Sequence, residues 1–473
     1  MDSKTNGFLN RFFHLNENNT NVKTEIIAGI TTFITIAYVL IINPQVLSSP
    51  FEIMGDSQMA QKISNGVFIG TCLGAFIGTI LVAFYAKLPF AQAPGMGLSA
   101  FFAYTTMLGM GYSYAQALVI VFISGILFIV ITALGIREAI IRAIPDSIKL
   151  AMTPGIGLFI TIIGLKNAGL VVGNEATLVS LVDFAKWRGP DANVELVMGA
   201  VLSLIGLCLI AILSYKKVKG AILISILAST LLGIPMGLTH ISNLSLNLGA
   251  QVNDFFEVSF FNLDFAGLFA GENMWTSIFT VTMLVLSFSL VNMFDSLGTL
   301  LAAAKQSGLV DEKGEVINLK KALMSDAIST AAGALVGTST VTTVVESSAG
   351  IAEGGRTGLT SLTTALLFLL SIVFVPIISI IPAQATAPAL IFVGILMLGG
   401  VKDIDFNDIT NALPAFCTIV FMPFTYSIAN GIALGLITYC IAKFFTGQKD
   451  QIKPLTLIIA LTFVFRYAFI TLG

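Results

Sequence analysis

The chain is poor in charged residues. Only 11% of its 473 residues are charged, whereas 56% are hydrophobic. A soluble protein of this length needs more charged side chains to cover its surface, so the composition excludes that class and predicts a protein embedded in lipid. The net charge of −2 carries no information about partners, because the placement of charge matters more than its sum in such a protein.

The chain also lacks the residue patterns of several other classes. Its four cysteines lie singly in apolar runs, which gives no metal or redox motif. It contains no phosphate-binding GxxxxGK loop and no GxGD protease motif, so ATP-driven transport and an intramembrane enzyme are both disfavoured. With only two histidines, any proton chemistry must use carboxylates. We therefore expect no enzyme, no cofactor beyond a coupling proton, and no nucleic-acid partner.

Long apolar runs fill most of the chain. A membrane-spanning helix needs about 20 mostly apolar residues. About fourteen segments qualify, near 26–47, 63–85, 91–108, 115–135, 147–165, 195–214, 218–236, 276–303, 321–336, 338–354, 360–380, 385–400, 408–446 and 454–472. The fold class predicted from them is an all-α polytopic membrane protein.

The distribution of basic residues predicts the orientation. The connection 238–275 carries four acids and no Lys or Arg, which places it outside the cell. The opposite side collects Arg137, Arg142, Lys149, Lys216, Lys217, Lys219, Lys305, Lys313, Lys320, Lys321 and Arg356. Both termini are then cytoplasmic and the protein lies in the cell membrane. Lys443, Lys449 and Lys453 disagree with this orientation, because they would fall outside.

The two halves of the chain resemble each other. Residues 144–168 and 381–404 both begin with Ile-Pro, carry a second proline, and have a glycine shortly before a lysine near the end. Each segment follows four candidate spans and precedes about two more. An odd number of spans per repeat inverts the second copy, so we predict a 7+7 inverted repeat, as in secondary transporters. The alternative is chance similarity between apolar runs.

Two segments are too broken to be ordinary spanning helices. Residues 88–104 contain two prolines and two glycines, and residues 336–355 pass from Val and Thr to Ser, Ala and Gly. Each is the third span of its repeat, and each predicts a short extended piece followed by a half-helix (spans 3 and 10). Non-helical backbone at membrane depth is tolerated only where it lines a protein cavity. The positive N-termini of two such half-helices would form a polar pocket near the midplane.

Two carboxylates lie within apolar segments of the second half. Asp295 and Glu346 each precede a basic residue by ten positions, which is ~15 Å along a helix and about half the hydrocarbon thickness. An acid at that depth is a functional-site hypothesis by default. Glu346 would stand at the N-terminus of its half-helix, and Asp295, with no cation nearby, is a candidate proton carrier. The alternatives are a capping carboxylate and a helix–helix hydrogen bond, respectively.

A carboxylate at the site favours a substrate that donates hydrogen bonds, because it accepts two parallel bonds from adjacent N–H groups such as those of a nucleobase. An anion carrier would more naturally leave the half-helix N-termini bare or add arginine. Further candidate binding residues are Ser99, Asn292 and Thr343, with the aromatic rings of Phe101, Phe102 and Phe294.

Three other polar positions are expected to be structural. We expect Asn43-Pro44 to end the first span, Glu353 and Arg356 to form a solvated pair, and Asp326 to lie at the membrane interface.

Several motifs carry a family resemblance. The chain resembles the purine-permease branch of the nucleobase–ascorbate transporter family, also called nucleobase:cation symporter family 2, from about residue 8 to 472. The motifs are APGMGLSAFFAY (93–104), FDSLGTL (294–300), VESSAGIAEGGRTGL (345–359), TAPALIFVGILM (386–397) and PAFCTIVFMPFTYSIANGIALG (414–435). Two positions depart from the branch: Ser99 replaces an asparagine, and Asn292 stands where many members carry an acid.

The resemblance implies a domain organisation. A core of spans 1–4 and 8–11 would bind substrate and face a gate of spans 5–7 and 12–14, often across a homodimer. The boundaries are 1–25 for the N-terminal segment, 26–143 and 276–380 for the core, 144–237 and 381–473 for the gate, and 238–275 for the extracellular loop.

The function implied is import of purine nucleobases, guanine and hypoxanthine or adenine, by proton symport with alternating access. Asp295 and Glu346 would bind substrate and couple the proton. The alternatives are uracil, xanthine or an anion carried on the same architecture. A channel is disfavoured because the two acids form no obvious ring around a pore.

Overall fold

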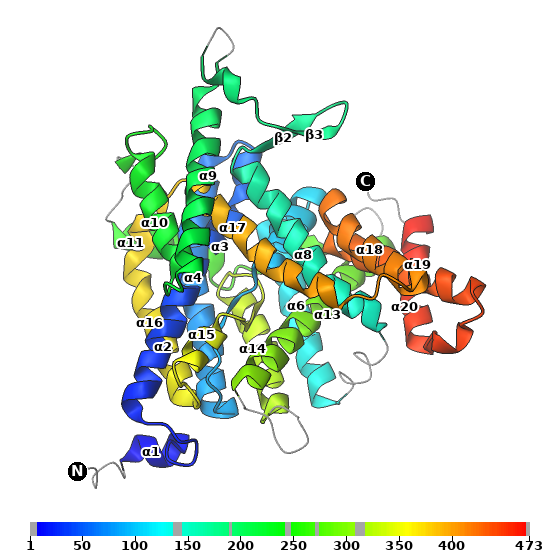
Figure 1. The fold of residues 1–473 in the computed structure, drawn as a ribbon, viewed down its shortest axis with the longest axis horizontal. Helices are drawn as coiled ribbons and strands as arrows, with labels where there is room; N and C mark the ends of the chain where they lie inside the picture. Colours follow the sequence, from blue (N-terminus) through cyan, green and yellow to red (C-terminus); the bar gives the residue numbers. More distant parts are fainter. Residues whose placement is uncertain are drawn as a thin grey trace.

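The structure is a computed structural model that describes residues 7–135, 144–188, 192–241, 247–269, 274–307 and 317–469. Helices of varied tilt pack around a centre that contains a short strand pair, and a hairpin projects from one end (Figure 1). Within the described ranges, nine helices are long and apolar enough to cross a membrane, and three shorter apolar helices accompany them. The chain is therefore a multi-pass membrane protein. Each predicted span contains at least one helix, while the count of fourteen spans stays a prediction.

The first half of the chain contains these elements: α1 (Phe8–Phe13), α2 (Val22–Ile36), α3 (Val39–Ile53), α4 (Ser57–Leu81), η1 (Val82–Ala86), β1 (Gln92–Pro94), α5 (Met96–Ala100), η2 (Phe101–Gly109), α6 (Tyr114–Ala133), α8 (Asp146–Asn167), β2 (Val171–Asn174), β3 (Leu178–Leu181), η3 (Phe184–Trp187), α9 (Val194–Tyr215) and α10 (Ala221–Gly233).

The second half contains α11 (Leu248–Asp254), η5 (Phe255–Ser259), α12 (Phe265–Leu268), α13 (Met274–Ser307), α14 (Leu319–Leu335), β4 (Val341–Thr343), α15 (Ser347–Ala352), α16 (Gly358–Leu370), η6 (Ser371–Ile380), α17 (Ala383–Leu398), η7 (Gly399–Asp403), α18 (Ile409–Phe424), α19 (Ile428–Phe445), η8 (Lys449–Gln451) and α20 (Pro454–Phe469).

Polar residues before the apolar runs start the helices. The side chain of Asn21 accepts a hydrogen bond from the Thr24 N–H at the start of α2, and Asp56 does the same for Met59 at the start of α4. Ser113 and Gln116 form a reciprocal capping box on α6. These caps satisfy N–H groups that a helix end leaves without partners, which fixes where each apolar helix begins.

The helices pack in two groups. In one, α2, α4, α6, α14 and α16 contact one another, with α3 packed on α4. In the other, α8 packs against α17 and α18, which in turn contact α9 and α19. Fewer contacts join the groups, among them those of α13 and α5 with α8, of α10 with α2, and of α17 with α3. The first group holds the strand pair.

Three local expectations differ from the structure. Residues 171–181 form a hairpin, β2–β3, which the sequence did not predict. The connection after α10 contains helical turns in α11, η5 and α12. Asn43-Pro44 does not end the first span, because α3 continues to Ile53 with Pro44 inside it. Pro44 lacks an N–H, but its fixed φ is compatible with a helix once the preceding turn adjusts.

One of the lysines that disagree with the predicted orientation is buried. The Lys443 side chain is 1% exposed, and its amine donates to Thr410 Oγ1 and Gln448 Oε1, each at 2.7 Å. The amine also lies 3.7 Å from an Asp408 carboxylate oxygen. Because its charge is neutralised inside the protein, Lys443 gives little information about orientation.

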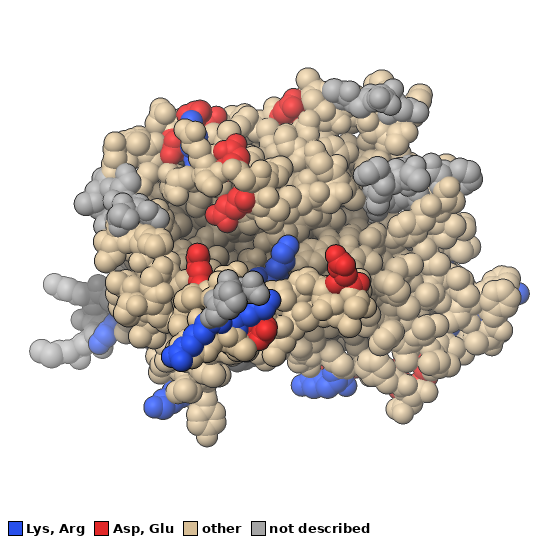
Figure 2. Space-filling view, turned by 90° about the horizontal axis from the view of Figure 1, so that it is seen from above, with Lys and Arg blue, Asp and Glu red and all other residues tan. Residues whose placement is uncertain are grey.

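Charged side chains are sparse on the outside of the molecule as well. Figure 2 shows a face where they gather in patches and the remaining area is uncharged. Many large apolar side chains are exposed, among them Phe374, Leu370 and Phe445 at 57%, 64% and 82%. An apolar exterior of this kind is suited to contact with the lipid chains of a membrane.

Candidate functional site

The centre of the molecule is a pair of short antiparallel strands. β1 pairs with β4 in the register Gln92–Thr343, Ala93–Thr342 and Pro94–Val341. Two backbone bonds of 3.2 Å extend the pairing at its ends, from Gly95 N–H to Thr340 O and from Val344 N–H to Ala91 O. The two broken segments predicted from sequence therefore meet as strands, and each strand is followed directly by a short helix.

The two helices leave the strand pair in opposite directions. α5 begins after Gly95 and α15 begins after Glu346. Because each helix directly follows its strand, the N-termini of both helices lie at the strand pair, where their positive dipole ends favour negative charge or hydrogen-bond acceptors. The first N–H groups of α15, those of Ser347, Ser348 and Ala349, already bond to the carbonyls of Val344, Val345 and Glu346. The expectation of two half-helices preceded by extended segments is confirmed.

Glu346 stands at the opening of the second half-helix. Its carboxylate accepts a 2.6 Å hydrogen bond on Oε1 from the hydroxyl of Tyr38, which lies between α2 and α3. Glu346 is partly exposed, and the neighbouring Val345 is 50% exposed. One oxygen of the acid is therefore held by the protein, while the residue keeps part of its surface exposed.

Ser99 lies in a buried polar network under the strands. Its hydroxyl donates to Asn43 Oδ1 at 2.7 Å and shares a 2.6 Å bond with Ser339. The Asn43 amide donates to Thr71 and Thr338, each at 2.8 Å. All five side chains are 0% exposed. In this structure Ser99 links α5 to α3 and to the segment that precedes β4. Its contact with a substrate stays a prediction.

Asp326 joins both strands to α14. Its Oδ1 accepts from the Gln92 amide, from the Thr343 N–H at 3.2 Å and from the Thr343 hydroxyl at 2.7 Å. Ser329, one turn further along α14, donates to Oε1 of the Gln92 side chain. The interfacial position expected for Asp326 is wrong, since the side chain is 0% exposed. Sequence reasoning missed it because only the strand pairing brings Gln92 and Thr343 to this level of α14.

Asn292 and its neighbours attach α13 to the same centre. The Asn292 amide donates to Thr330 Oγ1 at 2.9 Å, and Ser296 shares a 2.6 Å bond with Thr342 of β4. Both α13 side chains are buried. Asp295 and Phe294 lie on the same helix, but their side chains are outside the described residues. The backbone nevertheless places Asp295 one residue before Ser296, and so close to β4.

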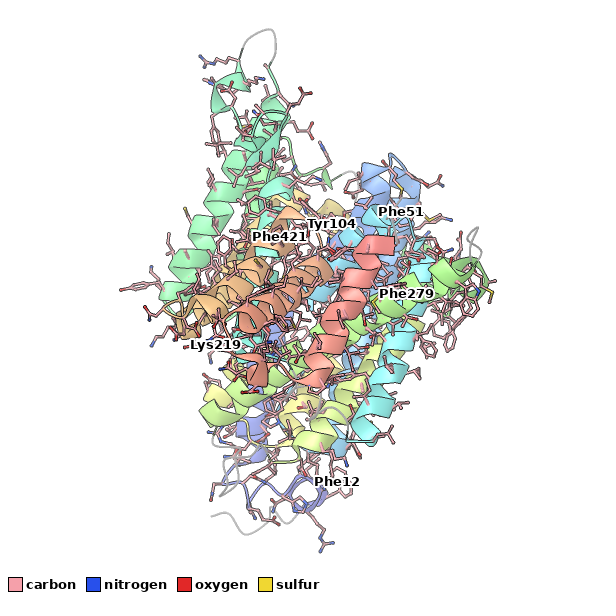
Figure 3. The ribbon with its side chains drawn as sticks, turned by 90° about the vertical axis from the view of Figure 1, so that its right-hand side faces the viewer. Phe12, Phe51, Tyr104, Lys219, Phe279 and Phe421 are labelled. Carbon is pink, nitrogen blue, oxygen red and sulfur yellow. The ribbon has the colours of Figure 1, made fainter. Side chains whose placement is uncertain are left out.

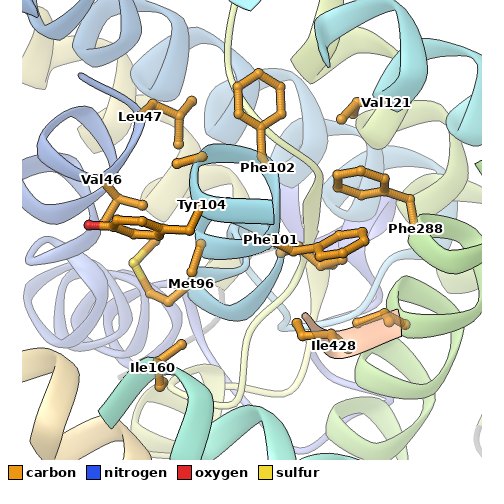
Figure 4. Close-up of a cluster of buried hydrophobic side chains, with 14 of the residues drawn as sticks. Val46, Leu47, Met96, Phe101, Phe102, Tyr104, Val121, Ile160, Phe288 and Ile428 are labelled. Carbon is orange, nitrogen blue, oxygen red and sulfur yellow. The ribbon is translucent and has the colours of Figure 1, made fainter. Parts of the chain in front are cut away.

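Phe101 belongs to a buried apolar cluster. Its ring centroid lies 4.6 Å from that of Phe288, and both rings are 0% exposed. Figure 4 shows the two rings side by side, with Phe102, Met96 and Ile428 around them. Stacking of Phe101 on a planar ligand stays a prediction, because in this structure the ring packs on α13.

Glu25 is a second buried acid that sequence reasoning missed. It is 0% exposed, and its carboxylate accepts from the N–H groups of Arg356, Thr357 and Thr360 and from the Thr360 hydroxyl. It therefore caps α16. The segment that carries these donors follows α15, so Glu25 holds the far end of the second half-helix against α2.

Glu353 does not pair with Arg356 as expected. Glu353 binds Lys219 at 2.8 Å, while the Arg356 guanidinium donates to the carbonyls of Ile351 and Gly355. Lys219 precedes α10, which packs on α9 and α17, so this ion pair links the end of α15 to the other helix group. Figure 3 shows Lys219 and Tyr104 at different heights in the molecule. Thr105 of η2, the residue after Tyr104, donates to Tyr426 O at 2.6 Å. The two groups are thus joined at two levels.

Comparison with known proteins identifies the family. A profile described as a permease family matches residues 23–434. An adenine permease of Escherichia coli is 39% identical over 98% of this chain and 97% of its own length. A guanine/hypoxanthine permease of Bacillus subtilis is 38% identical over 95% of this chain and 98% of its own length. The chain belongs to the purine-permease branch of the nucleobase–ascorbate transporter family.

A solved structure shows the same fold in a more distant protein. The transmembrane domain of a cyanobacterial bicarbonate transporter, BicA, superposes with a TM-score of 0.57 over 89% of this permease and 96% of that domain, at 16% identity. At this identity the likeness concerns the fold alone. Membership of the permease branch makes Glu346, between the two half-helices, the first residue to test in this protein.

Proposed function

We propose that this permease imports a purine nucleobase across the cell membrane by proton symport. The observation that supports it most directly is Glu346, an acid at a half-helix N-terminus that is held by Tyr38 on one oxygen and partly exposed. Such a carboxylate accepts N–H groups from an uncharged planar base. The relatives described above are adenine and guanine/hypoxanthine permeases, which makes a purine the first substrate class to examine.

The roles proposed for the two acids differ. Glu346 binds the base, and Asp295 on α13 carries the proton, since it lies in an apolar helix beside the strand pair. Ser99, Asn292 and Thr343 hold the strands in the position that presents Glu346, Phe101 belongs to the apolar surroundings of the site, and Phe294 is proposed to stack on the base. Both termini face the cytoplasm in this proposal.

Alternating access follows from movement between the two helix groups. The core would comprise 26–143 and 276–380, and the gate 144–237 and 381–473, arranged as a 7+7 inverted repeat of about fourteen spans. The preferential packing of α8 with α17 and α18 within one group, and of α14 with α6 in the other, supports this division. A homodimer would keep the gates fixed while each core moves.

The test is uptake of labelled hypoxanthine into cells that lack their own purine transporters. Unlabelled adenine, guanine, xanthine, uracil and bicarbonate serve as competitors, with and without a protonophore. We expect saturable uptake that the protonophore abolishes. Glu346→Gln should remove uptake, and Glu353→Gln, the same change at the other end of α15, should retain it.

Two outcomes would contradict the proposal at different points. If no nucleobase is carried or competes while the protein is present in the membrane, the substrate class is wrong. If Glu346→Gln transports normally, the acid is only a helix cap. Uptake that is insensitive to the protonophore at every pH would rule out proton symport while leaving nucleobase transport intact.

A further inference from the structure

Tyr38 occupies an unusual place in the first span. The chain tightens between α2 and α3, where the Leu40 N–H bonds to Ala37 O and the Ile41 N–H bonds to Tyr38 O, each at 3.1 Å. These bonds span three residues, whereas an α-helix spans four, so the turn is overwound at this point. The overwound turn directs the phenol toward α15, where its hydroxyl meets Glu346.

The hydrogen bond between the two side chains is short and protected. The distance is 2.6 Å, which lies at the short end of the range for a hydroxyl donor. Tyr38 is only 2% exposed, so water does not compete for its hydroxyl. Its ring is surrounded by buried side chains of the main core cluster, which fix its position.

The bond divides the carboxylate into two unequal acceptors. Oε1 already receives the phenol proton, whereas Oε2 receives no side-chain hydrogen bond from any residue that the structure describes. A free carboxylate pairs best with two adjacent, parallel N–H groups, one on each oxygen. Because the phenol occupies one of the two lone pairs of Oε1, that oxygen is the weaker acceptor, and Glu346 favours a single N–H group on Oε2 over a pair of N–H groups on both oxygens.

We infer that Tyr38 is a specificity-determining residue, which makes Glu346 favour a base with one N–H facing the acid over a base with two adjacent N–H groups. Hypoxanthine offers N1–H beside a C2–H, whereas guanine offers N1–H beside a 2-amino group. The second donor of guanine would compete with the phenol for Oε1. This inference rests on the proposed nucleobase transport, and it concerns the choice between purines.

The experiment compares wild type with Tyr38→Phe, which removes the hydroxyl and keeps the ring. The inhibition constants of unlabelled guanine and hypoxanthine are measured against uptake of labelled hypoxanthine. We expect the affinity for guanine relative to hypoxanthine to rise about tenfold in the variant, which corresponds to about 1.4 kcal/mol of discrimination. A general loss of activity affects both bases equally and cancels in the ratio of their inhibition constants. A purely structural role of Tyr38 would therefore leave this ratio unchanged.

Tyr114→Phe is the matched control. Tyr114 is also buried, and its hydroxyl makes an equally short 2.6 Å bond, but to the carbonyl of Gly337 and not to an acid. Its guanine-to-hypoxanthine ratio should equal that of wild type. A ratio that is unchanged in Tyr38→Phe, or equally changed in Tyr114→Phe, overturns the inference.

A second measurement covers the case in which Tyr38→Phe transports too slowly to assay. The same ratio is obtained from competition of both bases for labelled hypoxanthine bound to purified protein in detergent, with folding checked by thermal unfolding. If wild type binds and transports no purine, the proposed function fails. If wild type binds or transports purines and the guanine-to-hypoxanthine ratio is unchanged in Tyr38→Phe, only the role of Tyr38 fails.

Discussion

The two strand–helix segments at the centre share a geometry and differ in chemistry. β1 and α5 continue into η2, and every residue from Phe90 to Met96 is buried. β4 leads into α15, a helix of six residues, whose entrance carries the exposed Val345 and the partly exposed Glu346. The first segment is enclosed on all sides, whereas the second opens to accessible space at the point where its helix begins.

This difference suggests separate roles, in which the first segment supports the site and the second binds the ligand. Polar side chains of the first segment, Gln92 and Ser99, face inward and bond to protein groups on α14 and α3. The second segment uses Thr343 in the same way, but its acid, Glu346, is partly exposed and is the group that we propose for the ligand. In this arrangement only one of the two half-helices has to bind the ligand. The other fixes the position of the first through the strands that they share.

The largest expected effect comes from breaking the support common to both segments. Asp326→Leu removes the acceptor of the Gln92 amide and of both Thr343 donors, and each buried unsatisfied group costs about 1–3 kcal/mol. We expect almost no folded protein by size-exclusion chromatography in detergent. Ser325→Ala, on the same helix with its hydroxyl bonded only to Lys321 O among described residues, should remain folded. Comparable yields from the two variants would contradict the role given to Asp326.

A methyl group tests how tightly each half-helix is enclosed. On Gly350 of α15 a Cβ would lie 2.5 Å from the backbone carbonyl of Ala28 and against the Thr32 hydroxyl. On Gly97 of α5 it would lie 2.3 Å from the Cγ2 methyl of Ile156, a side-chain atom that a change in χ1 can move. Overpacking against backbone costs about 1–3 kcal/mol, so Gly350→Ala should lower the unfolding temperature more than Gly97→Ala does. Equal unfolding temperatures for the two variants would show that α2 and α15 can move apart without loss of stability.

Ser99→Ala probes whether the first segment contacts substrate. The variant removes the donor to Asn43 Oδ1 and the partner of Ser339, so stability should fall by about 1–2 kcal/mol. If the first segment only supports, the order in which nucleobases compete for uptake will not change. A changed order would instead show that Ser99 reaches the base and that both segments bind it.

The smallest effect is expected at the ion pair between the helix groups. Lys219 and Glu353 are 49% and 34% exposed at their side chains, and exposed pairs contribute less than about 1 kcal/mol. Lys219→Ala should change the hypoxanthine KM by less than about twofold, with the difference disappearing at high salt. Lys149→Ala, whose partner Asp146 is on the same helix, is the control. A large effect confined to Lys219 would mean that this pair limits movement between the groups.

The broken segments and Glu346 were predictable because their signals are local. Pro94 and Gly95, close together in an apolar run, favour a break in the helix there, and a charge in an apolar run suggests a functional site before its neighbours are known. The strand-then-helix form of both segments, and the position of Glu346 at the start of α15, are confirmed.

The partners of these residues were not predictable from single segments. Asp326 lies five residues after Lys321 and so suggested an interfacial position, but Gln92 and Thr343 converge on it from distant parts of the chain. Tyr38 and Glu25 likewise acquire their roles only through packing against α15 and α16. The β2–β3 hairpin was missed because its strands are four residues long and carry no clear alternation of apolar and polar residues.

The pairing of β1 with β4 has a consequence for biosynthesis. Its partners Gln92 and Thr343 are separated by 251 residues, so the first strand enters the membrane long before the second is made. At about 5–20 residues per second the interval is roughly 10 to 50 seconds, during which β1 exposes unpaired backbone groups that lipid cannot satisfy. A nascent chain that stalls within this interval keeps these backbone groups unpaired, because their partners on β4 have not been made.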